Sequence, residues 1–320
     1  MTNMEKRHVF GPVPSRRLGR SLGVDLVPHK TCTYNCLYCQ LGLTTNLTVK
    51  RGAFTDVDAL LREIERKLQT TPPPDYITLS GSGEPTLQCN LDALIAGIKR
   101  ITDIPVAALT NGSLLWCEDV RSELLEADLV IPSLDAGDAN LFERVNRPHS
   151  SLHFEDIVEG LIEFRRVYTG KIWLEVFLLD GISTTDEQIL KLKDMAHCAA
   201  PDRIQLNTVA RPPCESIARP ASAEALEHAA QMFGEKAEII AEHPSAGIVA
   251  TAAPDSADIV ELLRRRPCTL DDLAAGLGTH RLEVVKRIDP LLHNGTLVMR
   301  QYGRRIYIQP ANRVAQSGAV

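Results

Sequence analysis

Short apolar runs and amphipathic segments alternate along the first 240 residues. Each apolar run ends at Gly, Pro, Asn, Asp or Ser, as buried strands do, and apolar positions three and four apart, typical of helices, follow it. Strands are predicted at 22–27, 76–80, 106–110, 129–132, 172–179 and 203–206. Helices are predicted at 55–68, 91–101, 118–126, 154–168, 186–200 and 223–233. These strand-then-helix units predict an α/β fold with a parallel sheet and right-handed crossovers, and open, doubly wound and barrel-like sheets satisfy the pattern equally well.

The first of these helices has a recognisable start. Thr55 and Asp58 have the spacing of a capping box, in which the two side chains satisfy backbone N–H groups of the first turn. We therefore expect Thr55 to be the N-cap.

The pattern changes after residue 233. Residues 241–255 contain Pro and Gly without periodicity and are expected to form a connector. Three short helical patterns and a hairpin follow, at 257–266, 270–277, 281–293, 296–300 and 305–309. Three helices and a hairpin resemble a winged helix. We expect a partial barrel at 1–240, a linker at 241–254, a winged helix-turn-helix at 255–310 and a disordered tail at 311–320.

Charge is distributed unevenly between these parts. The net charge is −6, and residues 255–320 carry a balance of +3 while the rest carries −9. Phosphate contacts would come from the third helix of the module and from the hairpin, at Arg281, Lys286, Arg287, Arg300, Arg304 and Arg305. A balance of +3 is modest for a nucleic-acid-binding face. Nucleic-acid binding, peptide docking and simple domain packing therefore all stay open for the module.

Composition is that of a soluble globular chain. The hydrophobic share of 44% among 320 residues can fill a sizeable core. No apolar run reaches the ~18 residues of a membrane span, and no signal-peptide pattern is visible. Five of the eight cysteines are scattered without pairing, as reduced thiols are in the cytoplasm. We expect a cytoplasmic protein without membrane contact, and Cys214 is the scattered cysteine to check for a second cluster.

The other three cysteines stand together. Cys32, Cys36 and Cys39 have the spacing C-x3-C-x2-C, with Tyr38 before the last of them. A [4Fe-4S] cluster normally takes four thiolates, so three would leave one iron open to bind something that is not protein. The alternative is a structural zinc site, for which His29 would be the fourth ligand.

A second motif follows the predicted strand at 76–80. Its residues are Ser80, Gly81, Ser82, Gly83, Glu84 and Pro85. The two glycines let the backbone approach a ligand, and the glutamate offers a carboxylate to an ammonium group. Taken alone, the run is also compatible with an ordinary strand-to-helix turn.

Together these motifs resemble the radical S-adenosylmethionine (SAM) superfamily. The run at 11–19, Thr110 to Ser113, Asn146 to His149, Gln205 to Asn207 and Arg211 to Pro213 further resemble its branch that contains the tRNA wybutosine-synthesis radical enzyme. In one respect the chain departs from that branch, because no cysteine precedes Cys32, whereas the archaeal wybutosine enzyme carries a second cluster there. The wybutosine reaction itself is therefore not expected.

The resemblance implies a partial (β/α)6 TIM-type barrel with a [4Fe-4S] cluster and SAM as cofactors. Cys32, Cys36 and Cys39 would hold the cluster and would thereby be the catalytic residues. By the same resemblance, SAM would contact Tyr38, Ser80, Gly81, Ser82, Gly83, Glu84, Asn111, Ser133 and Asp135. One electron, from a donor such as flavodoxin or ferredoxin, would cleave SAM to methionine and a 5′-deoxyadenosyl radical that abstracts hydrogen from the substrate.

Other polar residues also follow predicted strands, where the loops of a barrel share one mouth. Glu175 lies within an apolar strand, so it either faces the cavity or pairs with a base such as Arg203. The group Arg16, Arg17 and Arg20 is either a solvated loop or an anion clamp. Arg147 and His149 form a similar candidate pair.

We therefore expect a radical SAM enzyme whose substrate is a tRNA nucleotide or, alternatively, a protein presented by the C-terminal module. A third interpretation is an iron-sulfur redox sensor that binds DNA.

Overall fold

A computed structural model describes residues 7–240 and 256–311 of the chain. Within these residues one large sheet has the strand order β1-β2-β5-β6-β7-β8-β9-β10, and every neighbouring pair is parallel except β1 with β2. Its strands are β1 (Val9–Ser15), β2 (Gly19–Val24), β5 (Tyr76–Leu79), β6 (Val106–Thr110), β7 (Leu129–Pro132), β8 (Lys171–Leu178), β9 (Arg203–Thr208) and β10 (Ala237–Ile239). The parallel sheet predicted from the alternation is therefore confirmed.

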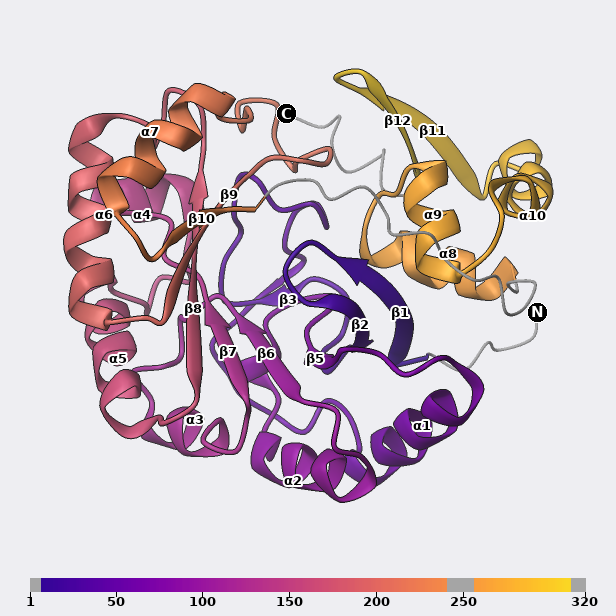
Figure 1. The fold of residues 1–320 in the computed structure, drawn as a ribbon, viewed down its shortest axis with the longest axis horizontal. Helices are drawn as coiled ribbons and strands as arrows, with labels where there is room; N and C mark the ends of the chain where they lie inside the picture. Colours follow the sequence, from indigo (N-terminus) through magenta and orange to yellow (C-terminus); the bar gives the residue numbers. More distant parts are fainter. Residues whose placement is uncertain (1–6, 241–255, 312–320) are drawn as a thin grey trace.

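Helices cover the outer face of this sheet, which curves into an incomplete barrel (Figure 1). They are α1 (Val57–Thr70), η1 (Pro85–Leu87), α2 (Leu91–Ile101), α3 (Glu118–Glu123), α4 (Ala139–Asn146), α5 (Phe154–Val167), α6 (Asp186–Ala199) and α7 (Ala223–Phe233). A two-stranded parallel pair, β3 (Thr31–Cys32) with β4 (Asn46–Leu47), lies in the loop after β2. The apolar outer face of the sheet and the inner faces of the helices form the main core.

The start of α1 differs from the prediction. Asp56 is the N-cap, and its carboxylate accepts a hydrogen bond from Ala59 N at 2.7 Å. The hydroxyl of Thr55 instead donates to Leu26 O at 2.9 Å. The predicted capping box was wrong. The Thr55 hydroxyl is already hydrogen-bonded to the loop after β2, and the neighbouring Asp56 is an equally good N-cap residue.

Two edge strands and one α-helix are among the elements that were not predicted. β1 contains Gly11, Pro12 and Pro14, residues that break strand patterns, but it is an edge strand with an irregular register, where proline is tolerated. β10 is only three residues long. Helix α4, capped by Asp138, lies between the predicted strand at 129–132 and the predicted helix at 154–168, where no element was predicted.

The C-terminal elements are those that the pattern predicted. They are α8 (Ser256–Arg265), α9 (Leu270–Leu277), α10 (Arg281–His293) and the antiparallel hairpin of β11 (Leu297–Tyr302) with β12 (Arg305–Pro310). Thr269 and Asp272 form a capping box at α9. The winged-helix assignment and the domain limits stay predictions. The predicted linker at 241–254 lies outside the described residues, and so does the predicted tail at 311–320 apart from Ala311.

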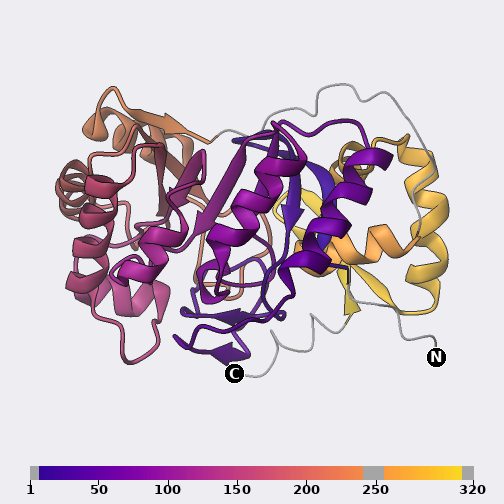
Figure 2. The same ribbon diagram turned by 90° about the horizontal axis from the view of Figure 1, so that it is seen from below.

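This C-terminal module, α8 to β12, packs beside β1 at the edge of the barrel in both views (Figures 1 and 2). Val13 of β1 is buried in the module's own core, together with Ile259, Leu263 and Leu273, and Phe10 packs against that core. Tyr307 of β12 donates to Ala210 O, in the loop after β9, at 2.7 Å. The module thus contacts the barrel both at its first strand and at the loop after β9.

The interior of the barrel has an apolar and a polar part. Ala107, Leu129, Ile131 and Trp173 fill one end with a small apolar cluster. Glu175 and Phe177 follow Trp173 at intervals of two on β8, so they share its inward face. Polar and aromatic side chains therefore line the barrel interior towards the carboxyl ends of the strands.

Candidate cluster and cofactor site

The cysteine loop and the glycine loop lie against each other. Lys30 N donates to Ser82 O at 2.6 Å, and Glu84 N donates to Thr31 O at 3.1 Å. A Cβ atom on Gly83 would stand 1.9 Å from Thr31 O, closer than any side chain tolerates. Glycine is therefore required at position 83 by packing, and two motifs fifty residues apart form one structure.

Each cysteine sulfur of the motif receives one side-chain N–H group. The pairs are Lys30 Nζ with Cys39 Sγ at 3.2 Å, Asn111 Nδ2 with Cys32 Sγ at 3.7 Å, and Asn146 Nδ2 with Cys36 Sγ at 3.7 Å. The donors come from the loop after β2, the end of β6 and the end of α4. Hydrogen bonds to sulfur are a means by which proteins tune iron-sulfur clusters. Three sulfurs with three donors fit a cluster held by three thiolates.

Burial also keeps two of these thiols neutral. It raises the pKa of Cys32 to about 12 and the pKa of Cys36 well above its ordinary value. Iron that binds here would displace these thiol protons, and cluster binding would then supply the free energy that keeps thiolates in a buried site.

A single metal ion fits the described residues less well. Among them, there is no group of three or more His, Cys, Asp or Glu side chains close enough together to hold a single metal ion. His29, the fourth ligand of the zinc interpretation, is exposed. The described residues therefore give no support to the zinc site or to a second cluster built from the scattered cysteines.

Glu84 fastens the glycine loop to the barrel. Its carboxylate accepts from Thr86 N at 3.0 Å, Thr110 Oγ1 at 2.6 Å and Asn111 N at 2.7 Å. The side chain is buried, and burial raises its pKa in spite of these bonds. Glu84 does not line the cavity described below, so its predicted contact with an ammonium group stays a prediction.

Asp135 is similarly engaged within the protein. Tyr38 OH donates to its carboxylate, and so do Asn146 Nδ2 at 2.8 Å and Phe177 N at 3.1 Å. Burial raises the pKa of Asp135 to about 6. The ring of Tyr38 stacks on Phe177 with centroids 3.9 Å apart. Asp135 thus orients the aromatic residue next to Cys39, and a ribose contact by Asp135 stays a prediction.

Glu175 faces the cavity and is paired, but with another arginine than expected. Arg17 donates to it at 2.7 Å and Asn207 at 2.6 Å. Burial opposes ionisation, yet Arg17 and Asn207 hold the pKa of Glu175 below its ordinary value. The pairing with Arg203 was wrong, because Arg203 lies over the Trp173 ring at 4.7 Å, with its charge near Glu238.

A cavity of about 390 Å³ opens at this end of the barrel. Of the predicted site residues, those that line it are Tyr38, Cys39, Ser80, Gly81, Gly83 and Ser133. Those that do not are Cys32, Cys36, Ser82, Glu84, Asn111 and Asp135. Arginines dominate the remainder of the wall, namely Arg16, Arg17, Arg211, Arg265 and Arg266. We had not predicted the last three as site residues, and nothing local in the sequence indicates that Arg265 or Arg266 reaches the barrel.

The other candidates lie at the margin. Arg20 is exposed and donates to Pro72 O at 2.9 Å, so it does not belong to an anion clamp with Arg16 and Arg17. Arg147 forms an ion pair with Glu215. His149 is exposed and interacts with Ser151. These contacts bring neither Arg147 nor His149 into the cavity wall.

Cys214 lies on the loop that meets the cysteine motif, since Glu215 N donates to Leu37 O at 3.1 Å. Burial raises the pKa of Cys214 to about 11, and the charge of Cys39 adds to the rise. The thiol is therefore neutral at pH 7.

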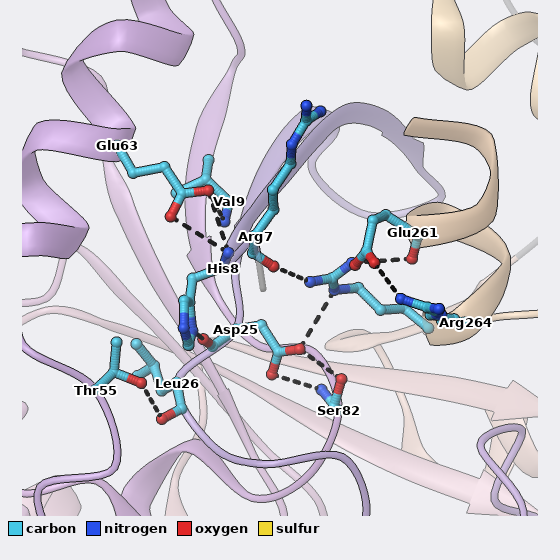
Figure 3. A network of polar contacts seen from close by, with 11 residues as sticks. Arg7, His8, Val9, Asp25, Leu26, Thr55, Glu63, Ser82, Glu261 and Arg264 are labelled. Atoms are coloured by element: carbon cyan, nitrogen blue, oxygen red, sulfur yellow. Dashed lines mark hydrogen bonds and ion pairs between the residues drawn. The ribbon is translucent and has the colours of Figure 1, made fainter. Parts of the chain in front are cut away.

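Helix α8 reaches the glycine loop through Asp25 (Figure 3). Asp25 accepts from Ser82 N at 2.9 Å, and Arg265 Nε lies 3.3 Å from the same carboxylate. Arg265 also contacts Glu261 at 2.9 Å and donates to Arg7 O at 2.7 Å. This buried ion pair joins the C-terminal module to the cofactor motifs.

The family model of the radical SAM superfamily matches residues 26–196. The chain belongs to the radical SAM superfamily. It is an enzyme of this superfamily, and the cofactors typical of the superfamily are a [4Fe-4S] cluster and SAM. The three cysteines, the donors to their sulfurs and the glycine loop all lie within the matched residues or at their edges. Among residues 7–240 and 256–311, the helices include none with the length and hydropathy of a membrane span.

Two curated proteins illustrate the relatives. The chain is 39% identical to UPF0026 protein MJ1312 of Methanocaldococcus jannaschii over 228 residues, 71% of each protein. It is 41% identical over 297 residues, 92% of this chain, to a Brachyspira hyodysenteriae protein named GTPase Obg. The chain spans only 44% of that protein's length and contains no G-x-x-x-x-G-K-S/T phosphate loop.

The fold also matches a solved structure. A radical SAM methyltransferase from Sphaerobacter thermophilus superposes with a TM-score of 0.51 at 17% identity, over 68% of this chain and 66% of that one. This likeness supports the partial barrel and no particular substrate.

Proposed function

We propose that this radical SAM enzyme abstracts hydrogen from a substrate held in the arginine-lined cavity. The observation that supports this proposal is that one continuous cavity joins the cofactor motifs to the arginines. It extends from Tyr38, Cys39 and Gly81 at the cofactor motifs to arginines of the loop after β1, the loop after β9 and the end of α8. A substrate in it would lie beside the cofactors and be enclosed by the C-terminal module.

The cluster and SAM, when bound, supply the reductive cleavage that yields methionine and a 5′-deoxyadenosyl radical. The chain contributes position and shielding. Cys32, Cys36 and Cys39 would hold three irons, and Gly81 and Gly83, which pack closely against Asp25 and Thr31, would present the backbone of the glycine loop to SAM. An electron donor such as flavodoxin or ferredoxin would complete the reaction.

A tRNA nucleotide is the substrate class that we favour, because an arginine-rich wall suits a phosphate. The C-terminal module would then bind the rest of the RNA. On α10, however, Arg281 pairs with Asp271 at 3.2 Å and Lys286 with Glu283 at 2.6 Å. The exposed hairpin residues Arg300 and Arg304 are thus better placed to meet phosphates.

Binding of tRNA can be measured by fluorescence anisotropy as a function of salt. Changing Arg300 and Arg304 together to Glu should weaken binding and reduce the salt slope by ~2. A slope equal to that of the unchanged protein would contradict RNA binding by the hairpin.

A protein substrate is the second candidate, because the module also exposes large apolar side chains. These are Leu282, Val285, Met299 and Ile306. Leu282 and Val285 lie one helical turn apart on α10 and so share an exposed apolar face, a feature of protein contacts. A pull-down after RNase treatment should then return one partner, and Leu282→Asp should abolish its capture. Equal capture by Leu282→Asp would exclude this surface.

The radical chemistry is tested first with the Cys32→Ala variant. After anaerobic reconstitution and reduction in the presence of SAM, the unchanged protein should form 5′-deoxyadenosine, while Cys32→Ala should lose the cluster absorbance and reduce the product at least a hundredfold. The control is Cys198→Ala, which removes an exposed cysteine outside the motif. Product formation by Cys32→Ala at the normal rate would refute the assignment.

A further inference from the structure

We propose that the guanidinium groups of Arg211 and Arg266 form a binding site for an anionic group of the substrate, a phosphate or a carboxylate. The site would lie where the barrel meets the C-terminal module. It deepens the proposed function and rests on it, because the anion belongs to the molecule that the cavity holds.

The two arginines come from distant parts of the chain. Arg211 lies on the loop after β9, and Arg266 directly follows α8. Both line the same cavity as Cys39. Among the described residues of its wall, Glu175 is the only carboxylate against five arginines. The cavity is therefore cationic overall.

Most of the remaining positive charge in this wall is balanced locally. Arg17 has Glu175 at 2.7 Å. Arg265 has Asp25 at 3.3 Å and Glu261 at 2.9 Å. These two arginines are thus occupied by structural ion pairs and have little capacity left for a ligand.

Arg211 and Arg266 have no such partner in the described part of the chain. Neither has a carboxylate within 4 Å, and the Nε atom of each is buried without a hydrogen-bond acceptor. Asp272 acts on Arg266 only from a distance, and the Cys268 thiol beside it is neutral at pH 7, because burial raises the pKa of Cys268. Two half-buried arginines without a local counter-charge therefore line one cavity.

This arrangement is unfavourable without a ligand. Burial lowers the pKa of Arg266, and the charge of Arg211 lowers it further. A buried donor without an acceptor and a buried charge without a counter-charge both destabilise the folded state. An anion that accepts from both groups removes both penalties. Guanidinium groups bind phosphate and carboxylate through paired N–H groups, which makes these two anions the matching ligands.

The test is calorimetric titration of the reconstituted, anaerobic holoenzyme. Pyrophosphate represents phosphate ligands and malonate represents carboxylate ligands, and each is titrated with and without saturating SAM. We expect saturable binding of one probe that persists with SAM. Arg211→Gln and Arg266→Gln should each raise its dissociation constant at least tenfold, and the probe that binds identifies the group.

The matched control is Arg264→Gln, which replaces another arginine at the end of α8, two residues before Arg266. Arg264 is exposed, pairs with Glu261 and does not line the cavity, so its replacement should leave the dissociation constant unchanged. If Arg266→Gln does not fold, Arg266→Lys keeps the charge without the planar fork and should still weaken binding severalfold.

Three results would overturn the proposal. The first is no saturable binding of either probe, and the second is equal binding by Arg266→Gln. The third combines two observations: the probe no longer binds once SAM is present, and Arg266→Gln binds SAM tenfold more weakly. Together they would assign the site to the SAM carboxylate. Cluster absorbance and 5′-deoxyadenosine are measured on the same samples, so failure of the radical chemistry is seen separately.

Discussion

At the scale of single residues, the cluster site consists of more than its cysteines. The sequence motif identifies the three thiols, but the N–H groups that point at them come from Lys30, Asn111 and Asn146. Only Asn111 was predicted among the site residues. Lys30 and Asn146 have no distinctive spacing, so only the fold could reveal that they reach sulfur.

Lys30 is the cation among these donors, and its side chain is buried. A positive charge ~5 Å from a cluster favours the reduced state by roughly 3 kcal/mol at an effective dielectric constant of ~20, and 1 kcal/mol corresponds to ~43 mV for one electron. We expect Lys30→Met to assemble the cluster and to lower its reduction potential by on the order of 50 to 150 mV. Redox titration followed by electron paramagnetic resonance measures this shift.

The matched control is Lys50→Met, at an exposed position. An unchanged potential in Lys30→Met, with the cluster intact, would show that this lysine does not tune the cluster.

At the scale of elements, the contact between the cysteine strand β3 and the glycine loop is decisive. Gly83 does not have a positive φ, so its requirement for glycine arises from packing, chiefly from the carbonyl of Thr31 at 1.9 Å and also from Val27 Cγ2 at 2.9 Å. From the sequence, the glycines were interpreted as residues that let a ligand approach the backbone. At position 83 the structure shows that a contact within the protein itself requires glycine at least as strictly.

Gly83→Ala should therefore displace the cysteine strand. We expect cluster incorporation, measured as iron per protein after reconstitution, to fall at least fivefold, with a fold otherwise retained by circular dichroism. Gly52→Ala is the control, because a Cβ at Gly52 meets only Phe54 at 3.8 Å, an ordinary contact. Full iron content in Gly83→Ala would mean that the loop can shift to accommodate the Cβ atom without disturbing the cluster site.

Most elements were predictable at this scale. Helix α2 and strands β6 and β7 have the predicted limits, because strong apolar periodicity and flanking Pro, Asn or Asp residues define them locally. Strand β1 was missed, since its prolines and glycine are acceptable only at a sheet edge, and an edge is a property of the sheet.

At the scale of the whole molecule, the barrel and the C-terminal module share contacts that make them interdependent. The buried pair of Asp25 and Arg265 is the clearest, with side chains 2% and 5% exposed. Because Asp25 also binds the Ser82 backbone, the module contacts the cofactor motifs through a single carboxylate.

Arg265→Met should leave Asp25 buried without its cation. Removal of one partner from a buried pair costs about 3 to 5 kcal/mol. We expect the urea midpoint of unfolding to fall accordingly, and SAM affinity to fall with it as the Ser82 loop loosens. Arg264→Met, on the exposed face of α8, should change the midpoint by the equivalent of ~0.5 kcal/mol or less. Equal midpoints for the two variants would show that the pair contributes nothing.

The sequence by itself determined the cysteine motif, the glycine loop, the alternation of strands and helices and the presence of a C-terminal module. These are local properties, set by spacing and periodicity within a few residues of one another. Only the tertiary structure decided that Arg17 rather than Arg203 pairs with Glu175, that Lys30 and Asn146 reach the cysteine sulfurs, and that Arg211 and Arg266 line the same cavity. Such contacts depend on the curvature of the sheet and the docking of the module, which bring together side chains that no short-range pattern connects.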